Sequence, residues 1–578
     1  MDRKKILQGL SRRKFLRNSV VAAAGASLLP TTLAGCNDDS EEFTPEGDFG
    51  FMEGVASFDP TQSQVILWSR YTPADNESGN PKIILDVATD ANFNDIVASE
   101  TVEVDANSDN TINVDVSNLN SNTKYYYRFR NERTQAVSIT GETKTLPATG
   151  EANEVKLAIM SCANFQAGLF NVYGAVAESD VDVVVHLGDY IYEYEAGGYG
   201  TNDLTASLGR EHVPAGEIIE IDEYRARYRQ YRGDEQLQKA HQLKPFICVW
   251  DDHEITNDAY TDGAENHDPS EGDYETRKMN AIQVWHEYLP ARVSDNTKIY
   301  RSFDMAGIVN LMMLDTRIIG RNKQLDYADY FTLNGFDQNS FLADWQDANR
   351  TILGSEQLNW LTSQLAGSSA QWQVLGNQAL MGKYYIPAEL LEVTAQIAAT
   401  GSATPELLAQ YNTLVTELVT IKSRILQGDP TVTAEEQARV ETVLPYNLDA
   451  WDGYPVEREV VFAAAAGKKL ISLAGDTHNA WYAQLSDNNK NKVGAEFATA
   501  SVSSPGFEGI FGDDPTVIAG FEQSNQLLID DLSYADAKNR GYVEVTFNDS
   551  NAEADYRYIN TLATVDPTTT SGNVVTES

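Results

Sequence analysis

Two kinds of hydrophobic pattern divide the chain after its first fifty residues. Between residue 49 and residue 147, short segments alternate apolar with polar positions, and Asn, Asp, Gly and Pro separate them; VILWSRYTP, TINVDV and KYYYRFRNE are examples. Short alternating strands with frequent turns are typical of a β-sandwich. We therefore predict an N-terminal all-β sandwich of the immunoglobulin or fibronectin kind over residues 49–147, and we expect no chemistry in it.

Continuous apolar runs replace this alternation from residue 155 onwards. VKLAIMSCA, VDVVVHLGD, FICVWDDHE and KKLISLAGDTHNAW are apolar strands that end in polar residues, and helical patterns lie between them. Strands that are apolar throughout occur in sheets covered on both faces, and their alternation with helices indicates an α/β domain. We assign residues 155–565 to this domain. GYVEVTFNDSNAEADYRYINTL is predicted to be its closing hairpin, and the last dozen residues are predicted to be disordered.

One stretch of the α/β domain lacks such strands. Residues 386–446 are rich in Ala, Leu, Glu and Gln, and their apolar positions recur with the period of amphipathic helices. We interpret them as a helical insertion that caps a functional site. An insertion that only packs on the surface explains the pattern equally well.

The first 48 residues carry targeting information. SRRKFLR (residues 11–17) is a twin-arginine core, an apolar run follows it, and LAGC ends at Cys36. The pattern resembles a lipoprotein signal, in which the cysteine is acylated and becomes the first mature residue. We expect residues 1–35 to be removed by way of the twin-arginine export machinery, and residues 36–48 to form a flexible tether. The protein is then periplasmic or at the cell surface, with Cys36 as its lipid anchor.

The net charge bears on nucleic-acid binding, and the cysteine content bears on disulfide bonds. The 43 basic and 85 acidic residues give a net charge of −42, which excludes the basic footprint of a protein that coats nucleic acid. Cys162 and Cys248 are the only cysteines after Cys36, too few for a disulfide scaffold. A single disulfide between them remains an alternative, although it would remove Cys162 from metal binding.

Candidate metal ligands follow four of the apolar strands. They are Cys162 after the first, Asp189 and Tyr192 after the second, Asp252, His253 and Asn257 after the third, and Asp476 and His478 after the fourth. Each is weak alone, because an Asp after a strand is often only a cap. Together they are stronger, because ligands of α/β domains sit at the strands' carboxyl ends. Thiolate, phenolate and imidazole favour a trivalent transition ion, whereas carboxylates and an amide favour calcium or another hard cation.

The same motifs resemble those of the PhoD family of alkaline phosphatases and phosphodiesterases. GDYIY, WDDHE, LDTR, WDGYP and GDTH occur in the family's order, and the resemblance covers about residues 50–560. It implies the metallophosphoesterase fold, a double β-sheet sandwich flanked by helices (αββα), and an iron and calcium centre. The GD-x-x-Y element is also similar to purple acid phosphatases, in which the tyrosine binds ferric iron.

The resemblance assigns a role to each site residue. It implies that Cys162, Tyr192 and His478 bind Fe3+, that Asp189 is shared by Fe3+ and Ca2+, that Asp252, Asn257 and Asp476 lie on the Ca2+ side, and that His253 protonates the leaving group. Arg317, in LDTR, is a candidate for contact with phosphate. An internal ion pair of Arg317 with Asp315 or another acid is an equally good alternative.

The expected activity is that of an exported phosphoric ester hydrolase serving phosphate acquisition. It would cleave small-molecule phosphate monoesters and diesters through a metal-bound hydroxide, with both cations stabilising charge at phosphorus. The nearest alternative is a phosphodiesterase or phospholipase D-like enzyme of the same fold. The alternative from another class is a non-catalytic surface lipoprotein that binds calcium or a glycan.

Overall fold

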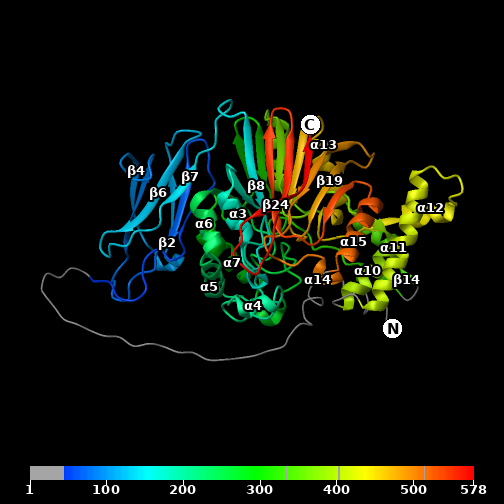
Figure 1. Cartoon of the computed structure of the whole chain (residues 1–578), viewed down its shortest axis with the longest axis horizontal. Coiled ribbons are helices and arrows are strands. Elements are labelled where there is room, and N and C mark those ends of the chain that lie inside the picture. Colours follow the sequence, from blue (N-terminus) through cyan, green and yellow to red (C-terminus); the bar gives the residue numbers. More distant parts are fainter. Residues whose placement is uncertain (1–43, 333–334, 401–403, 513) are drawn as a thin grey trace.

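Two large β-sheets packed face to face form the centre of the molecule, and helices lie outside them (Figure 1). The computed structural model describes residues 44–332, 335–400, 404–512 and 514–578. The predicted signal peptide, Cys36 and most of the predicted tether therefore lie outside the described residues.

The first sheet has nine strands. In spatial order they are β24 (Thr569–Glu577), β23 (Ala552–Ile559), β22 (Gly541–Asn548), β8 (Glu154–Met160), β9 (Val183–His186), β10 (Pro245–Cys248), β1 (Val55–Phe58), β2 (Val65–Arg70) and β5 (Thr111–Val116). The four central strands, β8, β9, β10 and β1, run parallel to one another. Their carboxyl ends therefore meet at one edge of the sheet.

The second sheet has seven strands. In spatial order they are β11 (Arg301–Met305), β12 (Val309–Met313), β15 (Trp372–Gly376), β18 (Lys469–Ala474), β20 (Lys492–Ala498), β19 (Ala480–Ser486) and β21 (Leu532–Asp536). Strands β12, β15, β18 and β20 are parallel. Apolar side chains of both sheets, such as Val184 of β9 and Val374 of β15, belong to one buried core.

Helices lie on the outer faces of the two sheets or project from them in the helical insertion. They are α3 (Asn171–Glu178), α4 (Asp203–Ser207), α5 (Ile221–Arg232), α6 (Glu235–Leu243), α7 (Tyr274–Tyr288), α8 (Gln338–Trp345), α9 (Gly354–Gly367), α10 (Ala388–Thr400), α11 (Pro405–Leu426), α12 (Ala434–Glu441), α13 (Pro455–Ala464), α14 (Glu508–Phe511) and α15 (Pro515–Leu528). Helices α3, α6 and α7 contact the nine-stranded sheet, and α9 and α13 share a core with the seven-stranded one. This arrangement confirms the predicted αββα architecture. None of the described helices is both long and apolar enough to span a membrane.

The N-terminal β region shares a sheet with the α/β domain. Its second layer is a sheet of β4 (Ile96–Glu103), β3 (Lys82–Ala88), β6 (Lys124–Asn131) and β7 (Gly141–Lys144), which packs on β1, β2 and β5. The sandwich is present, but β1 pairs in parallel with β10, so one of its layers continues the nine-stranded sheet. Asp59, directly after β1, also forms a buried bidentate ion pair with Arg301 of β11, with both nitrogen–oxygen distances at 2.7 Å.

A chain that begins at residue 148 is expected not to fold into a soluble monomer. Removal of β1 exposes the backbone edge of β10 and leaves the Arg301 guanidinium buried without its carboxylate. The measurement is size-exclusion chromatography with circular dichroism, and a chain beginning at residue 44 is the control, because it keeps every described strand. A compact, soluble monomer from the shorter chain would contradict the shared-sheet interpretation.

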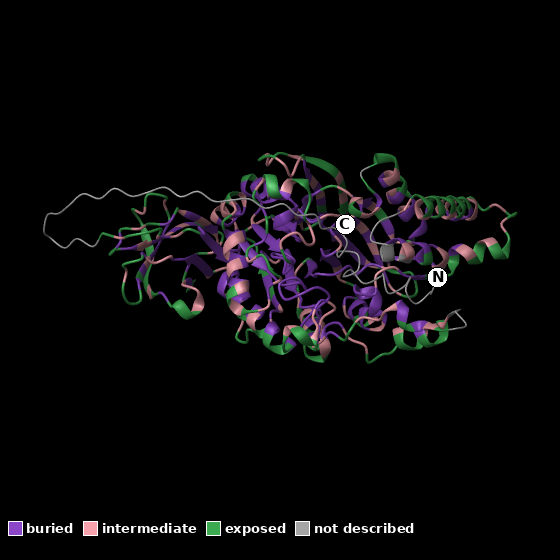
Figure 2. Cartoon of the chain, turned by 90° about the horizontal axis from the view of Figure 1, so that it is seen from below, coloured by how far each residue is buried: buried purple, intermediate pink, exposed green. Residues whose placement is uncertain are grey.

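The predicted helical insertion stands on a short two-stranded stem. β16 (Tyr385–Pro387) and β17 (Val443–Pro445) pair antiparallel, and α10, α11 and α12 lie between them. Thr404 caps the first turn of α11 by accepting a hydrogen bond from the Leu407 backbone N–H, and Pro405 occupies the first helical position. α11 packs on α15, beside the α/β core, and the far end of the insertion is largely exposed (Figures 1 and 2).

The C-terminal residues differ from the sequence prediction. β22 and β23 form the expected hairpin, but β24 follows, so the nine-stranded sheet extends to Glu577 and the last dozen residues are ordered. β24 has the polar sequence TTSGNVVTE and is mostly exposed at the sheet edge. Its order comes from backbone pairing with β23, which composition does not reveal.

Candidate metal centre

The loops after β8, β9, β10 and β18 come together where the two sheets meet. Cys162 lies two residues after β8, Asp189 three after β9, Asp252 four after β10 and Asp476 two after β18. The Cys162 N–H donates to the Gly188 carbonyl over 3.2 Å, which joins the first two loops. All four side chains are almost completely buried.

Backbone geometry at these loops is unusual. Positive φ angles, between 53° and 64°, occur at Cys162, Asp189, Asp476 and His478. Residues other than glycine rarely adopt this backbone conformation. Such strain persists where the surroundings enforce it and is concentrated at functional sites. Gly188, with φ of 103°, allows the loops after β9 and β10 to approach, because a Cβ there would lie 2.4 Å from the Asp251 nitrogen.

The Glu254 carboxylate holds the loop after β9 and the loop after β10 together by hydrogen bonds. It accepts hydrogen bonds from the backbone N–H groups of Asp189, at 3.0 Å, and Asp251, at 2.7 Å. Burial, together with the neighbouring Asp189 carboxylate, raises the pKa of Glu254 to about 8. Several acidic groups are thus held together away from water, an arrangement that a bound cation would stabilise.

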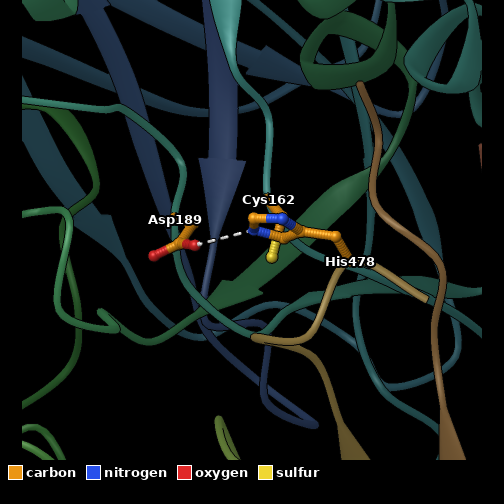
Figure 3. Close-up of side chains that lie close together, drawn as sticks. All are labelled: Cys162, Asp189 and His478. Carbon is orange, nitrogen blue, oxygen red and sulfur yellow. Dashed lines mark ion pairs between the residues drawn. The ribbon is translucent and has the colours of Figure 1, made fainter. Parts of the chain in front are cut away.

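The predicted iron ligands converge. Ligand atoms of Cys162, Asp189 and His478 all lie within 4.8 Å of one another, and His478 Nε2 is 3.9 Å from Asp189 Oδ2 (Figure 3). The Tyr192 hydroxyl donates to Asp189 Oδ2 over 2.9 Å and lies 3.1 Å from His478 Nε2. A thiol, a carboxylate, a phenol and an imidazole therefore surround one point.

A second group of hard oxygen donors adjoins the first. Asp189, Asp252 and His253 form one compact cluster, and Asp251, Asp252 and Asp476 form another. Asp189 belongs both to this side and to the thiol side, which is the geometry required of a bridging carboxylate. Asp189 Oδ1, Asp251 Oδ2 and Asn257 Oδ1 are buried and have no hydrogen-bond partner among the described residues. Buried oxygens that lack a donor are suited to a metal ion, so the residues present fit a dinuclear centre.

The protonation states of the soft ligands depend on such an ion. Burial, and then the Asp189 charge, raise the pKa of the Cys162 thiol and of the Tyr192 phenol well above their ordinary values. Neither group would ionise in this environment without a cation. A metal ion reverses this preference, because coordination deprotonates thiols and phenols outright.

His253 lies against the second group and is held by a glutamate. Its Nδ1 is 2.7 Å from Glu193 Oε2, and Glu193 also accepts from the Asn257 N–H over 2.8 Å and from Asn266 Nδ2 over 3.1 Å. Burial lowers the pKa of His253, but the carboxylates of Glu193, Asp189 and Asp252 outweigh it, and the pKa is raised well above its ordinary value. A protonated imidazole beside the donor cluster is the state a general acid requires.

Arg317 lies inside the protein. Its guanidinium is fully buried and forms ion pairs with Asp251, with Asp449 at 2.8 Å and with Asp476 at 3.3 Å. This geometry matches the internal ion-pair alternative and gives Arg317 a positioning role. Its charge holds three carboxylates of the oxygen-donor group in place, those of Asp251, Asp252 and Asp476.

Residues that contribute to the site but were absent from the predicted set include Glu193, Tyr199, Asp251, Glu254 and Ser504. Tyr199 OH lies 2.8 Å from His478 Nδ1, and the Ser504 hydroxyl donates to the Tyr192 oxygen over 2.7 Å. Glu193 and Asp251 directly adjoin predicted ligands in the sequence, so their position was the available signal. Cys162 and Cys248 both have free thiols, which rules out the disulfide alternative.

Glu193→Gln is expected to lower kcat/KM for the phosphate-ester hydrolysis expected from the sequence by about 10–100-fold, because an amide holds His253 less firmly and leaves it less basic. The double variant with His253→Ala is expected to be no worse than His253→Ala alone, since both act through one ring. Glu178→Gln, on an exposed helix end, is the matched control. Additive losses in the double variant would show that Glu193 acts independently of His253.

The two stacked sheets with helices outside have the metallophosphoesterase fold, and a mixed sulfur, nitrogen and oxygen donor set lies at their strand ends. The fold is similar to that of purple acid phosphatase PPD1 from yellow lupin, with a TM-score of 0.50 and 12% identity over 87% of this chain and 71% of that one.

The sequence specifies the family further. Residues 157–556 match the family model of the PhoD-like phosphatase, residues 37–147 match that of its N-terminal domain, and the chain belongs to this family. It is 31% identical over 568 residues to alkaline phosphatase D of Bacillus subtilis (strain 168), covering 94% of this chain and 84% of that protein. A solved structure of PhoD matches with a TM-score of 0.70 and 27% identity, over 91% of this chain and 90% of that one. The protein is therefore a phosphoric ester hydrolase.

Proposed function

We propose that the protein is an alkaline phosphatase of the PhoD type that hydrolyses phosphate monoesters and diesters at an iron and calcium centre outside the cytoplasm. The observation that carries the proposal is the division of the donor set around Asp189. A thiol, a phenol and an imidazole lie on one side of this carboxylate, and the carboxylates of Asp251, Asp252 and Asp476 lie on the other. An anionic thiolate and an anionic phenolate favour a trivalent transition ion such as ferric iron, and hard oxygen donors favour calcium.

The residues of the site would have distinct roles in metal binding and proton transfer. Cys162, Tyr192 and His478 would hold Fe3+, Asp252, Asn257 and Asp476 would hold Ca2+, and Asp189 would hold both. When bound, the two cations supply charge neutralisation at phosphorus and lower the pKa of water. His253 would hold a proton close to the departing oxygen, and Glu193 would fix the orientation of its ring.

The proposal is tested by elemental analysis of the purified protein together with phosphate release at alkaline pH. Iron and calcium in comparable amounts, with turnover of p-nitrophenyl phosphate and bis-p-nitrophenyl phosphate, is the expected result. Calcium alone without hydrolysis would instead favour the calcium- or glycan-binding lipoprotein. Turnover of the diester far above that of the monoester would favour the phosphodiesterase or phospholipase D-like alternative.

Export and anchoring are proposed from the N-terminal sequence. The twin-arginine core and Cys36 support export in a folded state followed by lipidation. Replacing Arg12 and Arg13 with lysine is expected to retain the protein in the cytoplasm, and Cys36→Ala to release it from the membrane fraction. Cell fractionation with activity assays measures both. Unchanged fractionation of both variants would exclude this route.

A further inference from the structure

A small apolar cavity lies between the helical insertion and the α/β domain. Its lining includes Ile386, Leu390 and Tyr411 on the insertion side and Trp481, Phe507 and Phe521 on the other. The cavity volume is about 40 Å³. That exceeds the roughly 10–15 Å³ that a single water requires, and it suits a group of a few carbon atoms.

Two segments of the chain contribute residues both to this cavity and to the candidate metal centre. Thr477, which lines the cavity, stands between the predicted ligands Asp476 and His478, and Trp481 Nε1 donates to its hydroxyl over 2.9 Å. Thr477 is partly exposed, whereas the residues on either side of it are buried. The metal-binding loop is therefore also one wall of the cavity.

The second of these segments contains Ser504 and Phe507. The Ser504 hydroxyl donates to the Tyr192 oxygen, and Phe507, three residues later, lines the cavity. Between them, the Pro505 carbonyl lies 2.9 Å from His478 Nδ1. The segment that holds Tyr192 and His478 by hydrogen bonds therefore also supplies part of the apolar lining.

Two polar side chains of the cavity lining, Asp452 and Asn525, form hydrogen bonds inside the protein. The Asp452 carboxylate accepts from Arg458 over 2.6 Å and from the Tyr384 N–H over 2.9 Å. The Asn525 amide donates to the Phe521 carbonyl over 2.9 Å. Burial of carbon atoms in the cavity would therefore strengthen the binding of a ligand, whereas burial of a hydroxyl group would weaken it.

We propose that this cavity receives a small apolar group attached to the substrate's phosphorus, so that the enzyme prefers phosphate esters of apolar alcohols over those of polyols. The inference rests on the proposed function and adds a substrate class to it. It also gives the insertion a role in choosing substrates, because three of its apolar side chains form one wall.

The test uses linear alkylphosphonates, from methyl to hexyl, as competitive inhibitors of p-nitrophenyl phosphate hydrolysis by the metal-loaded enzyme. All share one phosphonate head, so differences in Ki report the alkyl chain alone. We expect Ki to fall about fourfold for each added methylene until the cavity is full, and then to level off. A phosphonate that ends in two hydroxyls is expected to bind no better than methylphosphonate.

Cavity variants identify where the alkyl chain binds. Thr394→Leu and Ala450→Leu each add carbon to the lining from opposite walls, and both are expected to abolish the dependence on chain length while leaving Ki for methylphosphonate within about twofold. Leu390→Ala enlarges the cavity and is expected to move the levelling-off point to longer chains. Ala409→Leu, on the exposed face of α11, is the matched control and is expected to behave as the wild type.

The outcomes separate the cavity from the catalytic function. A flat wild-type series, or a slope that survives in both filling variants, would overturn the cavity as a substrate site while leaving the hydrolase intact. Absence of hydrolysis of every ester by the metal-loaded enzyme would overturn the proposed function and this inference with it. A slope present in the wild type and lost in either folded filling variant supports the inference.

Discussion

Replacing Asp189 with alanine is expected to remove bound metal and to lower the rate of phosphate-ester hydrolysis by at least about 10³-fold. Asp189 belongs to both donor groups, and one of its oxygens is buried and has no hydrogen-bond partner in the described part of the chain. Loss of the shared carboxylate separates the two sites and removes several kcal/mol of charge stabilisation. Elemental analysis and kcat/KM for p-nitrophenyl phosphate measure the two effects on one preparation.

The control for this variant is Asp304→Ala, which removes an exposed carboxylate from β11 and is expected to leave metal content and turnover unchanged. Full turnover of Asp189→Ala would show that the donor cluster is not the reaction site. Loss of metal with unchanged turnover would show that the ions serve only the fold.

Replacing Arg317 with methionine is expected to destabilise the metal-loaded protein by about 3–5 kcal/mol. The substitution keeps the volume of the side chain but leaves the carboxylates of Asp251, Asp449 and Asp476 without the cation that contacts them all. Arg317→Lys is expected to recover only part of the loss, because an ammonium cannot reach three acids at once. Denaturant unfolding, followed by tryptophan fluorescence, measures the difference.

Arg424→Met is the comparison for this prediction, since Arg424 pairs with Asp429 and Glu436 at the surface of the insertion. A change below about 1 kcal/mol is expected there, because water screens exposed pairs. If Arg317→Met kept its stability and lost only turnover, Arg317 would be a phosphate-binding group and the positioning role would be wrong.

The candidate ligands were predictable because each follows an apolar strand. At Asp189 and Asp476 the sequence shows an apolar strand followed by a glycine and an acidic residue. Parallel strands bring their carboxyl ends, and the residues that follow them, to one edge of the sheet. The sequence did not show which of two adjacent acidic residues would belong to the site. Asp251 and Asp252 are adjacent, and the tertiary contacts of Asp251 with Asp476 and with Arg317, sixty-six residues away, show that Asp251 also belongs to the site.

Long-range pairing limited the prediction of the fold. VASF, the sequence of β1, predicts a strand, but its parallel partner β10 begins at Pro245, and no local pattern joins them. Glu193 illustrates the same limit in the site. It follows Tyr192 in an ordinary loop, and its importance depends on Asn257 and Asn266 arriving from another part of the chain.

The hydrogen-bonded stem beneath the helical insertion has a consequence for how this protein family can diversify. Tyr385 and Pro445 are register partners, so the chain leaves and re-enters the domain at neighbouring points. Helices could be lengthened, shortened or exchanged above that stem at little cost in loop-closure entropy. The reaction chemistry and the choice of alcohol could then evolve on separate parts of one polypeptide.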